Sequence, residues 1–248
     1  MSGHSHWAGI KHKKAANDAK RGKLWSKLAR NIIATTKQAG PDPDQNLALR
    51  YAIEKAKAAN MPKDTIEKAI KKGSGNLDGV NYENVLYEGY GNNGVAVMCA
   101  ALTDNRNRTA AELRKIFEKT GGALGQSGCV AWIFSQKGII TVEQEGVDEA
   151  ELMEIAIDAG ADDFIKEADT YDITCPIEAF ENIKRALKEK EFPIQQSEIS
   201  QLPSTLVKLD EKGTKKILDL LERLDDQDDV QNVYANYEVP DDLLEKPT

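Results

Sequence analysis

The apolar residues of this chain change their spacing near residue 80, and this change limits the folds that the chain can adopt. Before that point they recur at helical intervals, as Leu24, Leu28 and Ile32 do. After it they alternate in short runs bounded by glycine and asparagine, which is typical of strands. The glycine-rich segment 74–81 separates the two patterns. The sequence therefore predicts a helical N-terminal domain followed by α+β structure.

Three N-terminal stretches combine helical spacing with a stop signal, and they cover about 17–39, 44–59 and 63–72. Asp44 is the expected N-cap of the second helix. Gly73 is the expected left-handed C-cap of the third. Because the connections between these helices are short, we expect one compact helical domain.

Short strands and helices alternate in the rest of the chain. Strands are predicted at 82–90, 95–103, 129–135, 139–142, 164–167, 171–175, 194–199 and 230–239, and helices at 107–120, 147–159, 178–188 and 211–224. The segment 91–94 is the expected turn of a hairpin, and 136–138 is a second expected turn. The alternation lacks long parallel repeats, which favours α+β layers.

The expected fold class is a multi-domain α+β protein. An N-terminal three-helix domain is followed by two ferredoxin-like (open-faced sandwich) α+β domains. A helix and a strand return after a self-contained α+β unit, which indicates that the third domain is inserted into the second. The expected domains are a basic arm and helical domain (1–78), an α+β domain (79–143 plus 203–248) and an inserted α+β domain (144–202).

Charge is unevenly distributed along the chain. The formal net charge is −8, but residues 1–79 hold 16 Lys and Arg against 7 Asp and Glu. The remainder holds 17 Lys and Arg against 34 Asp and Glu. A basic module on an acidic body is typical of a protein that binds a polyanion such as nucleic acid. The acidic body argues against a protein that coats nucleic acid along its whole surface.

Cationic side chains gather before residue 31. A row of them falls on one side of the predicted first helix, away from the apolar stripe, and others lie in the preceding arm. The predicted nucleic-acid-binding residues here are Trp7, Lys11, His12, Lys13, Lys14, Lys20, Arg21, Lys23, Lys27 and Arg30. The cations would neutralise phosphates, while Trp7 and the histidines would stack on unpaired bases. The alternative is a solvated helix face that keeps the protein in solution.

Two further charged groups lie in the acidic body. Arg106 and Arg108 precede or begin a predicted helix, where they would bind phosphate or form caps and salt bridges; the sequence leaves both open. A dense acidic cluster between a predicted helix and strand consists of Asp225, Asp226, Asp228 and Asp229. A solvated turn is the expected explanation of the cluster, and a Mg²⁺ site is the alternative.

No catalytic or cofactor site is expected. The segment 89–94 matches GxGxxG by letter, but it leads into a strand rather than the helix that a dinucleotide site needs. All three histidines lie at or before His12, which argues against a Ser-His-Asp or Cys-His set. The sequence therefore predicts a protein that is not an enzyme, with no metal, cofactor or small-molecule substrate.

Membrane insertion is not expected either. No apolar run approaches the roughly 20 residues that span a bilayer. The N-terminus is polar and then basic, without the apolar stretch of a signal peptide. We therefore expect a cytoplasmic protein without a membrane partner.

Long stretches of the chain closely resemble the YebC-type family, which includes the mitochondrial translational activator of cytochrome c oxidase. The matching stretches are 3–30 (GHSHWAGIKHKKAANDAKRGKLWSKLAR), 60–75, 87–125, 128–134 (GCVAWIF) and 228–236 (DDVQNVYAN). The likeness covers essentially the whole chain. Two departures are His6, where the family commonly has lysine, and Asn92-Asn93, where it usually has Pro-Gly.

The resemblance implies three domains, the third inserted into the second, and a role without catalysis. It also implies a DNA-binding transcriptional regulator, which is the family's usual description. The alternative is a ribosome-associated, rRNA-binding translation factor that eases synthesis of difficult, proline-rich stretches. The sequence contains no clear helix for reading base edges, and on physical grounds this favours RNA slightly over DNA as the target. A protein-interaction adaptor is the remaining alternative.

Overall fold

The structure, a computed structural model, describes residues 18–75 and 82–239. These residues divide into two compact units. The first unit holds the described residues up to 129 together with 211–235, and the second holds 130–210 together with 236–239. Seven α-helices and ten strands lie in the described residues, and the strands form two four-stranded sheets and one two-stranded sheet. A helical N-terminal region followed by two sheet-containing parts confirms the predicted fold class.

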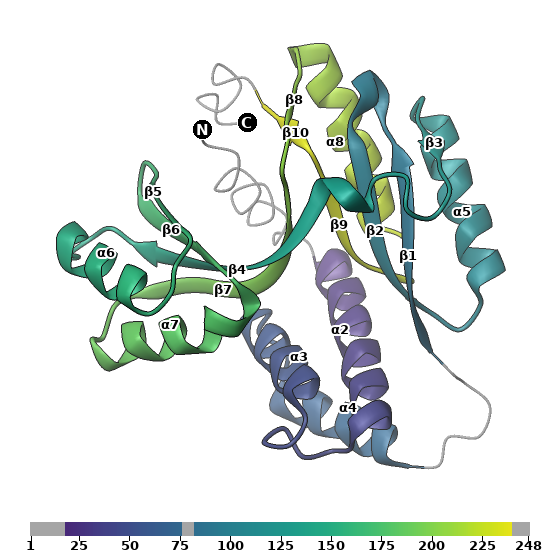
Figure 1. The fold of residues 1–248 in the computed structure, drawn as a ribbon. Helices are drawn as coiled ribbons and strands as arrows, with labels where there is room; N and C mark the ends of the chain where they lie inside the picture. The colour runs from purple at the N-terminus through teal and green to yellow at the C-terminus, as the bar shows by residue number, and fades with distance from the viewer. Residues whose placement is uncertain (1–17, 76–81, 240–248) are drawn as a thin grey trace. The chain divides into compact units, whose positions relative to one another are not determined.

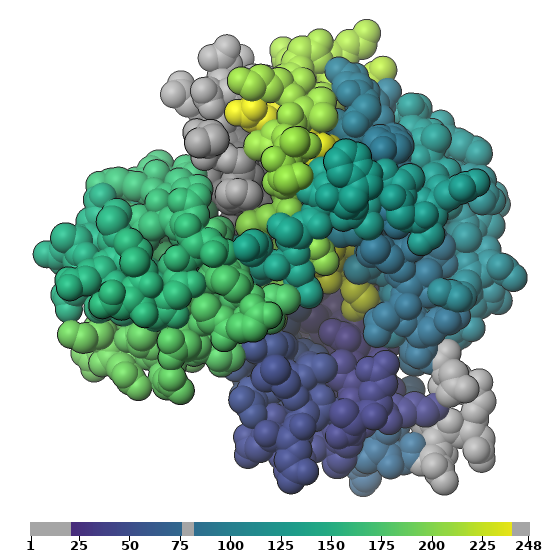
Figure 2. Space-filling view, viewed as in Figure 1, coloured from purple at the N-terminus to yellow at the C-terminus, as the bar shows by residue number. Residues whose placement is uncertain are grey.

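The helical part of the first unit contains α2 (Asp18–Ala39), α3 (Leu47–Ala58) and α4 (Lys63–Ser74). Its core consists of the buried side chains of Leu28, Ile32, Leu49, Ala52, Ala56, Met61, Ile66 and Ala69. The indole Nε1 of Trp25 donates a hydrogen bond to the carbonyl oxygen of Ala59 at 3.0 Å, which joins α2 to the end of α3. The atoms of these helices, purple to blue, form one closely packed body in Figure 2.

The N-cap of α3 is Asn46, so the prediction of Asp44 was wrong. The Oδ1 atom of Asn46 accepts a hydrogen bond from the backbone amide of Leu49 at 3.0 Å. Its Nδ2 atom donates to the carbonyl oxygens of Thr35, at 2.9 Å, and Gly40, at 2.8 Å. A buried amide side chain both accepts and donates, whereas an aspartate would have left the two carbonyls without this donor. Asn46 therefore closes the α2–α3 connection.

Gly73 is also placed differently from the prediction, because it lies inside α4 rather than after it. A Cβ atom at this position would be 2.7 Å from the carbonyl oxygen of Ile33 and 2.7 Å from Cβ of Thr36. Glycine thus allows the backbones of α2 and α4 to approach closely. The positive-φ explanation does not apply, and the residue is required for packing.

The sheet of the first unit has the order β3-β1-β2-β9, and its paired strands are antiparallel (Figure 1). Its strands are β1 (Glu83–Tyr90), β2 (Ala96–Thr103), β3 (Ala123–Leu124) and β9 (Val230–Ala235). Two helices pack on it, α5 (Arg106–Lys119) and α8 (Glu211–Asp225), and they bury Leu113, Phe117, Ile217 and Leu220. The pairing of β1 with β2 around the short 3-10 helix Asn92–Gly94 confirms the predicted hairpin.

The second unit contains another four-stranded antiparallel sheet, of order β5-β6-β4-β7. Its strands are β4 (Phe134–Glu143), β5 (Asp163–Lys166), β6 (Thr170–Cys175) and β7 (Ile194–Pro203). The helices α6 (Glu149–Asp158) and α7 (Ile177–Glu189) cover it with buried Leu152, Phe180, Ile183 and Leu187. The strands β8 (Val207–Lys208) and β10 (Tyr237–Glu238) form a separate parallel pair.

The predicted turn at 136–138 is wrong, because β4 runs without a break through these residues. Lys137 and Gly138 pair with Ser200 and Ile199 of β7, and Gly138 also pairs with Cys175 of β6. The segment before β4, Ala131–Ile133, is a 3-10 helix rather than a strand. In the sequence, β4 lies before the expected inserted domain, 144–202. It nevertheless pairs with β6 and β7, which lie within that domain apart from Pro203, the last residue of β7.

Candidate nucleic-acid interface

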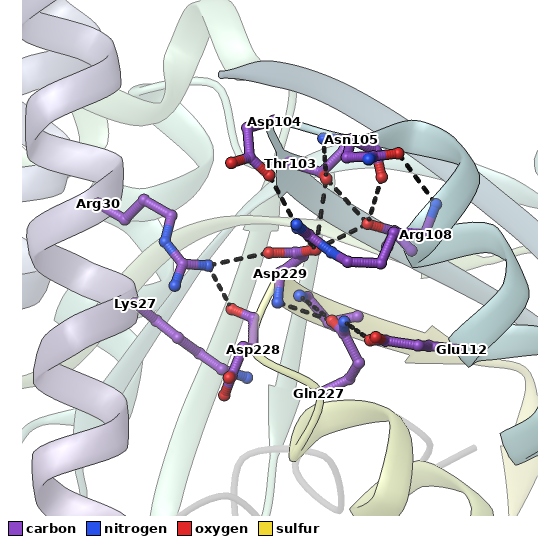
Figure 3. Close-up of polar contacts among 12 residues, drawn as sticks. Lys27, Arg30, Thr103, Asp104, Asn105, Arg108, Glu112, Gln227, Asp228 and Asp229 are labelled. Atoms are coloured by element: carbon purple, nitrogen blue, oxygen red, sulfur yellow. Dashed lines mark hydrogen bonds and ion pairs between the residues drawn. The ribbon is translucent and has the colours of Figure 1, made fainter. Parts of the chain in front are cut away.

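Three cations of α2 contact the segment that joins α8 to β9, within the first unit, and Figure 3 shows two of them, Lys27 and Arg30. Lys23, Lys27 and Arg30 are three or four residues apart, so they lie on one side of the helix. The segment that they meet, residues 225–229, is called the acidic segment below. These contacts connect the helical part of the unit to its sheet.

Lys27 is buried, with 7% of its surface exposed. Its ammonium group donates a hydrogen bond to the backbone carbonyl oxygen of Asp225. Burial lowers the pKa of Lys27, because a charge is less stable away from water, while the carboxylate of Asp225 acts in the opposite direction. The side chain is therefore used in packing, and its position leaves it no access to a phosphate.

Arg30 binds the acidic segment through two acceptors. Its Nη1 atom donates to the carbonyl oxygen of Asp228 at 2.7 Å and to Oδ1 of Asp229 at 3.2 Å. Its guanidinium group also lies 5.9 Å from the ring centroid of Tyr82, within cation–π range. Lys23 makes a looser contact, 3.6 Å from the exposed carboxylate of Asp228, and such surface pairs contribute little.

The carboxylate of Asp229 lies between two cations, Arg30 of α2 and Arg108 of α5. Nη2 of Arg108, on α5, lies 2.8 Å from Oδ2, and the hydroxyl of Thr109 donates to the same oxygen at 2.7 Å. The hydroxyl of Thr103 is a further donor at 3.3 Å. Burial acts to raise the pKa of Asp229, but the hydrogen bonds from Arg108 and Thr109 outweigh it, so the pKa lies below its usual value.

The turn around Asp229 is held by the side chain of Gln227. Its Oε1 atom accepts hydrogen bonds from the backbone amides of Asp229, at 2.7 Å, and Val230, at 3.0 Å. Its Nε2 atom donates to the carboxylate of Glu112 on α5 at 2.8 Å. The acidic segment is thus fixed by α2, α5 and its own side chains together.

The two arginines of α5 have different surroundings. The side chain of Asn105 caps α5 by accepting from the amide of Arg108 at 3.1 Å, and Arg108 also pairs with Asp104 at 2.8 Å. Arg106 is exposed and lies 3.4 Å from the carboxylate of Glu83. Of the two explanations left open for Arg108, the network of caps and salt bridges is the one that the structure contains.

The predicted cation row is therefore only partly outward-facing. Arg21 is exposed and Lys23 is partly exposed, whereas Lys27 is buried, so the expectation that it faces solvent was wrong. Leu24, expected in the apolar stripe, is 44% exposed. Trp7, Lys11, His12, Lys13 and Lys14 lie outside the described residues, and Lys20 lies in α2 with its side chain outside them.

Asp229 is the residue whose importance the sequence reasoning missed. Its cluster was expected to be a solvated turn, which holds for the exposed Asp226 and Asp228 but is wrong for Asp229, of which 5% is exposed. Among the described residues, no group of His, Cys, Asp or Glu side chains could hold a metal ion. The only sequence signal was the density of aspartates, which does not reveal a partner almost 200 residues away, as Arg30 is.

In residues 18–75 and 82–239, every helix is too short or too polar to cross a membrane.

Two family models match the chain and together cover most of it. The model described as "TACO1/YebC protein N-terminal domain" matches residues 5–76. The model described as "TACO1/YebC second and third domain" matches residues 82–237. The residues between the two matches, 77–81, fall in the glycine-rich segment where the helical pattern ends.

Curated relatives and a solved structure agree with these matches. A "Probable transcriptional regulatory protein" of Natranaerobius thermophilus is 51% identical over 248 residues, which is 99% of each chain. One of the same name from Dictyoglomus turgidum is 52% identical over 246 residues, again 99% of each. The crystal structure of a conserved hypothetical protein from Aquifex aeolicus superimposes with a TM-score of 0.84 at 49% identity, covering 97% of this chain and 100% of that one. The chain belongs to the TACO1/YebC family.

Proposed function

We propose that this protein is a non-enzymatic regulator of gene expression that binds nucleic acid through its basic N-terminal region. The charge contrast carries the proposal: residues 1–79 have 16 cations against 7 anions, and the rest has 17 against 34. Such a contrast directs a polyanion to one part of a chain and repels it from the other. The relatives are named transcriptional regulatory proteins, which supports a regulatory role.

The cations divide into two groups in this proposal. Arm residues such as Lys11, Lys13 and Lys14, with the exposed Arg21, would contact phosphates and release counterions. Lys27 and Arg30 would instead hold α2 against the acidic segment, so that the contacting residues are presented from a fixed helix. Arg106 remains a proposed phosphate contact, and Arg108 a residue of the network around Asp229.

DNA is the first proposed target, because the relatives carry the name of transcriptional regulators. Ribosomal RNA is the second, and one observation favours it. In the major groove of duplex DNA, the planar side chains of Arg, Asn and Gln each form a pair of hydrogen bonds to one base, Arg to guanine and Asn or Gln to adenine. The exposed positions of α4 carry no Arg, Asn or Gln, and their lysines are flexible point charges that suit contacts to phosphates. In either role we place the protein in the cytoplasm, without a small-molecule substrate or cofactor.

Formaldehyde crosslinking in cells, followed by sequencing of the DNA and RNA attached to the protein, tests this proposal. Peaks at promoters would support the transcriptional role. Peaks in rRNA, or recovery of ribosomes together with the protein, would support the translational role. Recovery of a single protein partner that survives both nuclease treatment and high salt, with no nucleic acid enriched, would contradict the proposal and favour an adaptor.

A further inference from the structure

A second set of cations, in addition to those of the N-terminal residues and of α2, belongs to α4. Lys68, Lys71 and Lys72 are exposed and spaced at i, i+3 and i+4, which places them on adjoining positions of one helix surface. This set is called the α4 lysine face. The opposite side of α4 carries Ile66, Ala69 and Gly73, which are buried.

The α4 lysine face differs in its surroundings from the cations that connect the parts of the first unit and from the first lysine of α4. Lys23, Arg30 and Arg108 each pair with a carboxylate of residues 225–229, and Lys63, at the start of α4, lies 3.6 Å from Glu67. In the segments 18–75 and 82–239, no carboxylate lies within ion-pair distance of the three lysines. Their charges are therefore available to a ligand.

Packing fixes the direction of this face. Because a Cβ atom at Gly73 would approach the carbonyl oxygen of Ile33 to 2.7 Å, α4 lies against α2 with almost no space between the backbones. A rotation of α4 would move Ile66 and Ala69 out of the core of the helical part. The α4 lysine face is thus held outward by close contacts, and it does not depend on a loop.

The chemistry of the face fits phosphates better than a protein partner. The large apolar side chains that are exposed in the described residues include none from α4, and α4 contains no Trp, Tyr or Arg. Protein interfaces depend on such anchors at their centre. Lysine ammonium groups are compact charges that neutralise phosphates without demanding a fixed geometry.

We propose that the α4 lysine face is a second phosphodiester-binding surface, separate from the arm, that contacts the backbone of the bound nucleic acid. This inference rests on the proposed function, and it adds a site to which the family matches and the names of relatives assign no role. It implies that the bound nucleic acid contacts the C-terminal half of α4 as well as the arm.

Lysines in the last turns of a helix also stabilise its negative end, which is the structural alternative. That role would affect the stability of α4 and not the affinity for nucleic acid. The test therefore compares charge reversal (K68E/K71E/K72E) with charge removal (K68Q/K71Q/K72Q), in the full chain. Circular dichroism and thermal unfolding show whether each variant keeps its fold.

The chain contains a matched control on α8. Lys212, Lys215 and Lys216 have the same i, i+3, i+4 spacing, are exposed and lie in the same unit, but belong to the acidic body. The variant K212E/K215E/K216E changes the net charge by the same amount. Any general repulsion of nucleic acid is therefore the same in both triples.

Binding is measured by fluorescence anisotropy with a labelled 20-base-pair DNA duplex and, separately, a labelled RNA hairpin, over a range of salt concentrations. The two triple variants of α4 are expected to bind at least about tenfold more weakly than the wild type at low salt. The slope of log affinity against log salt should become shallower by about 2 to 3. The α8 triple should keep the wild-type slope. The probe that shows the larger loss identifies the preferred polymer.

Three outcomes overturn the inference. Folded α4 variants that bind like the wild type would show that the face makes no contact. Equal losses in the α4 and α8 triples would reduce the effect to net charge. A wild-type protein without salt-dependent binding to either probe would overturn the proposed function itself, and this inference with it. Wild-type binding combined with unaffected α4 variants would overturn this inference alone.

Discussion

Replacement of Asp229 by alanine is expected to lower the free energy of unfolding by about 2–4 kcal/mol. Asp229 is 5% exposed, and its carboxylate accepts hydrogen bonds from Arg30, Arg108 and Thr109. Without it, a cation of α2 and a cation of α5 would face each other with no anion between them. Urea unfolding followed by circular dichroism measures the loss.

Asp226→Ala is the matched control, because Asp226 belongs to the same segment but is exposed. Its expected effect is within about 0.5 kcal/mol, as for ordinary surface substitutions. Equal effects of the two substitutions would show that the network around Asp229 does not stabilise the unit.

The contribution of Asp229 also depends on pH. Its pKa in the folded protein is below the usual value, so the carboxylate stabilises the fold fully above the ordinary aspartate pKa of about 3.9. The contribution is lost as the pH falls through the lower, folded-state pKa. The difference in stability between the wild type and Asp229→Asn should therefore shrink on acidification, in the pH range below about 4.

Replacement of Lys27 by glutamate is expected to cost about 3–5 kcal/mol and to unfold a marginally stable protein. The new carboxylate would be buried beside the carbonyl oxygen of Asp225 and close to the carboxylates of Asp225, Asp226 and Asp228. Lys27→Met removes the charge but keeps the apolar length of the side chain, and we expect it to remain folded. Thermal unfolding of the two variants separates charge from packing.

Arg21→Glu is the comparison for Lys27→Glu, because Arg21 is an exposed cation of the same helix. It should change the unfolding free energy by less than about 1 kcal/mol. A stable Lys27→Glu variant would contradict the buried position of Lys27. The comparison also matters for binding studies, because loss of binding by Lys27→Glu would report unfolding and not a missing phosphate contact.

Elements with a strong local pattern could be predicted from the sequence. The helix predicted at about 17–39 is Asp18–Ala39, and the hairpin around 91–94 has its strands where the alternation of apolar residues placed them. Apolar spacing and glycine-rich turns act over a few residues, so they are visible in a single sequence. The fold class followed from the order of these elements.

Features that depend on distant residues could not be predicted. The segment 136–138 has the composition of a turn, but pairing with β7 along its whole length, and with β6 at Gly138, keeps it in a strand. The row of cations on α2 has the composition of a solvated face, but Lys27 and Arg30 meet residues about 200 positions away. No local pattern indicates which side of a charged helix will be covered.

The central claim is that the basic N-terminal region binds nucleic acid. It is tested most directly by the salt dependence of binding, measured for the wild type and for an arm variant, K11E/K13E/K14E. The arm variant is a cleaner test than removing residues 1–39, because Leu28 and Ile32 of α2 belong to the core of the helical part. With about 5 to 8 phosphates contacted, log affinity for a nucleic-acid probe should fall with log salt at a slope of about −4 to −7, and the arm variant should be shallower by about 2 to 3. A wild-type slope near zero, or an arm variant that binds as tightly as the wild type at every salt concentration, would contradict the claim.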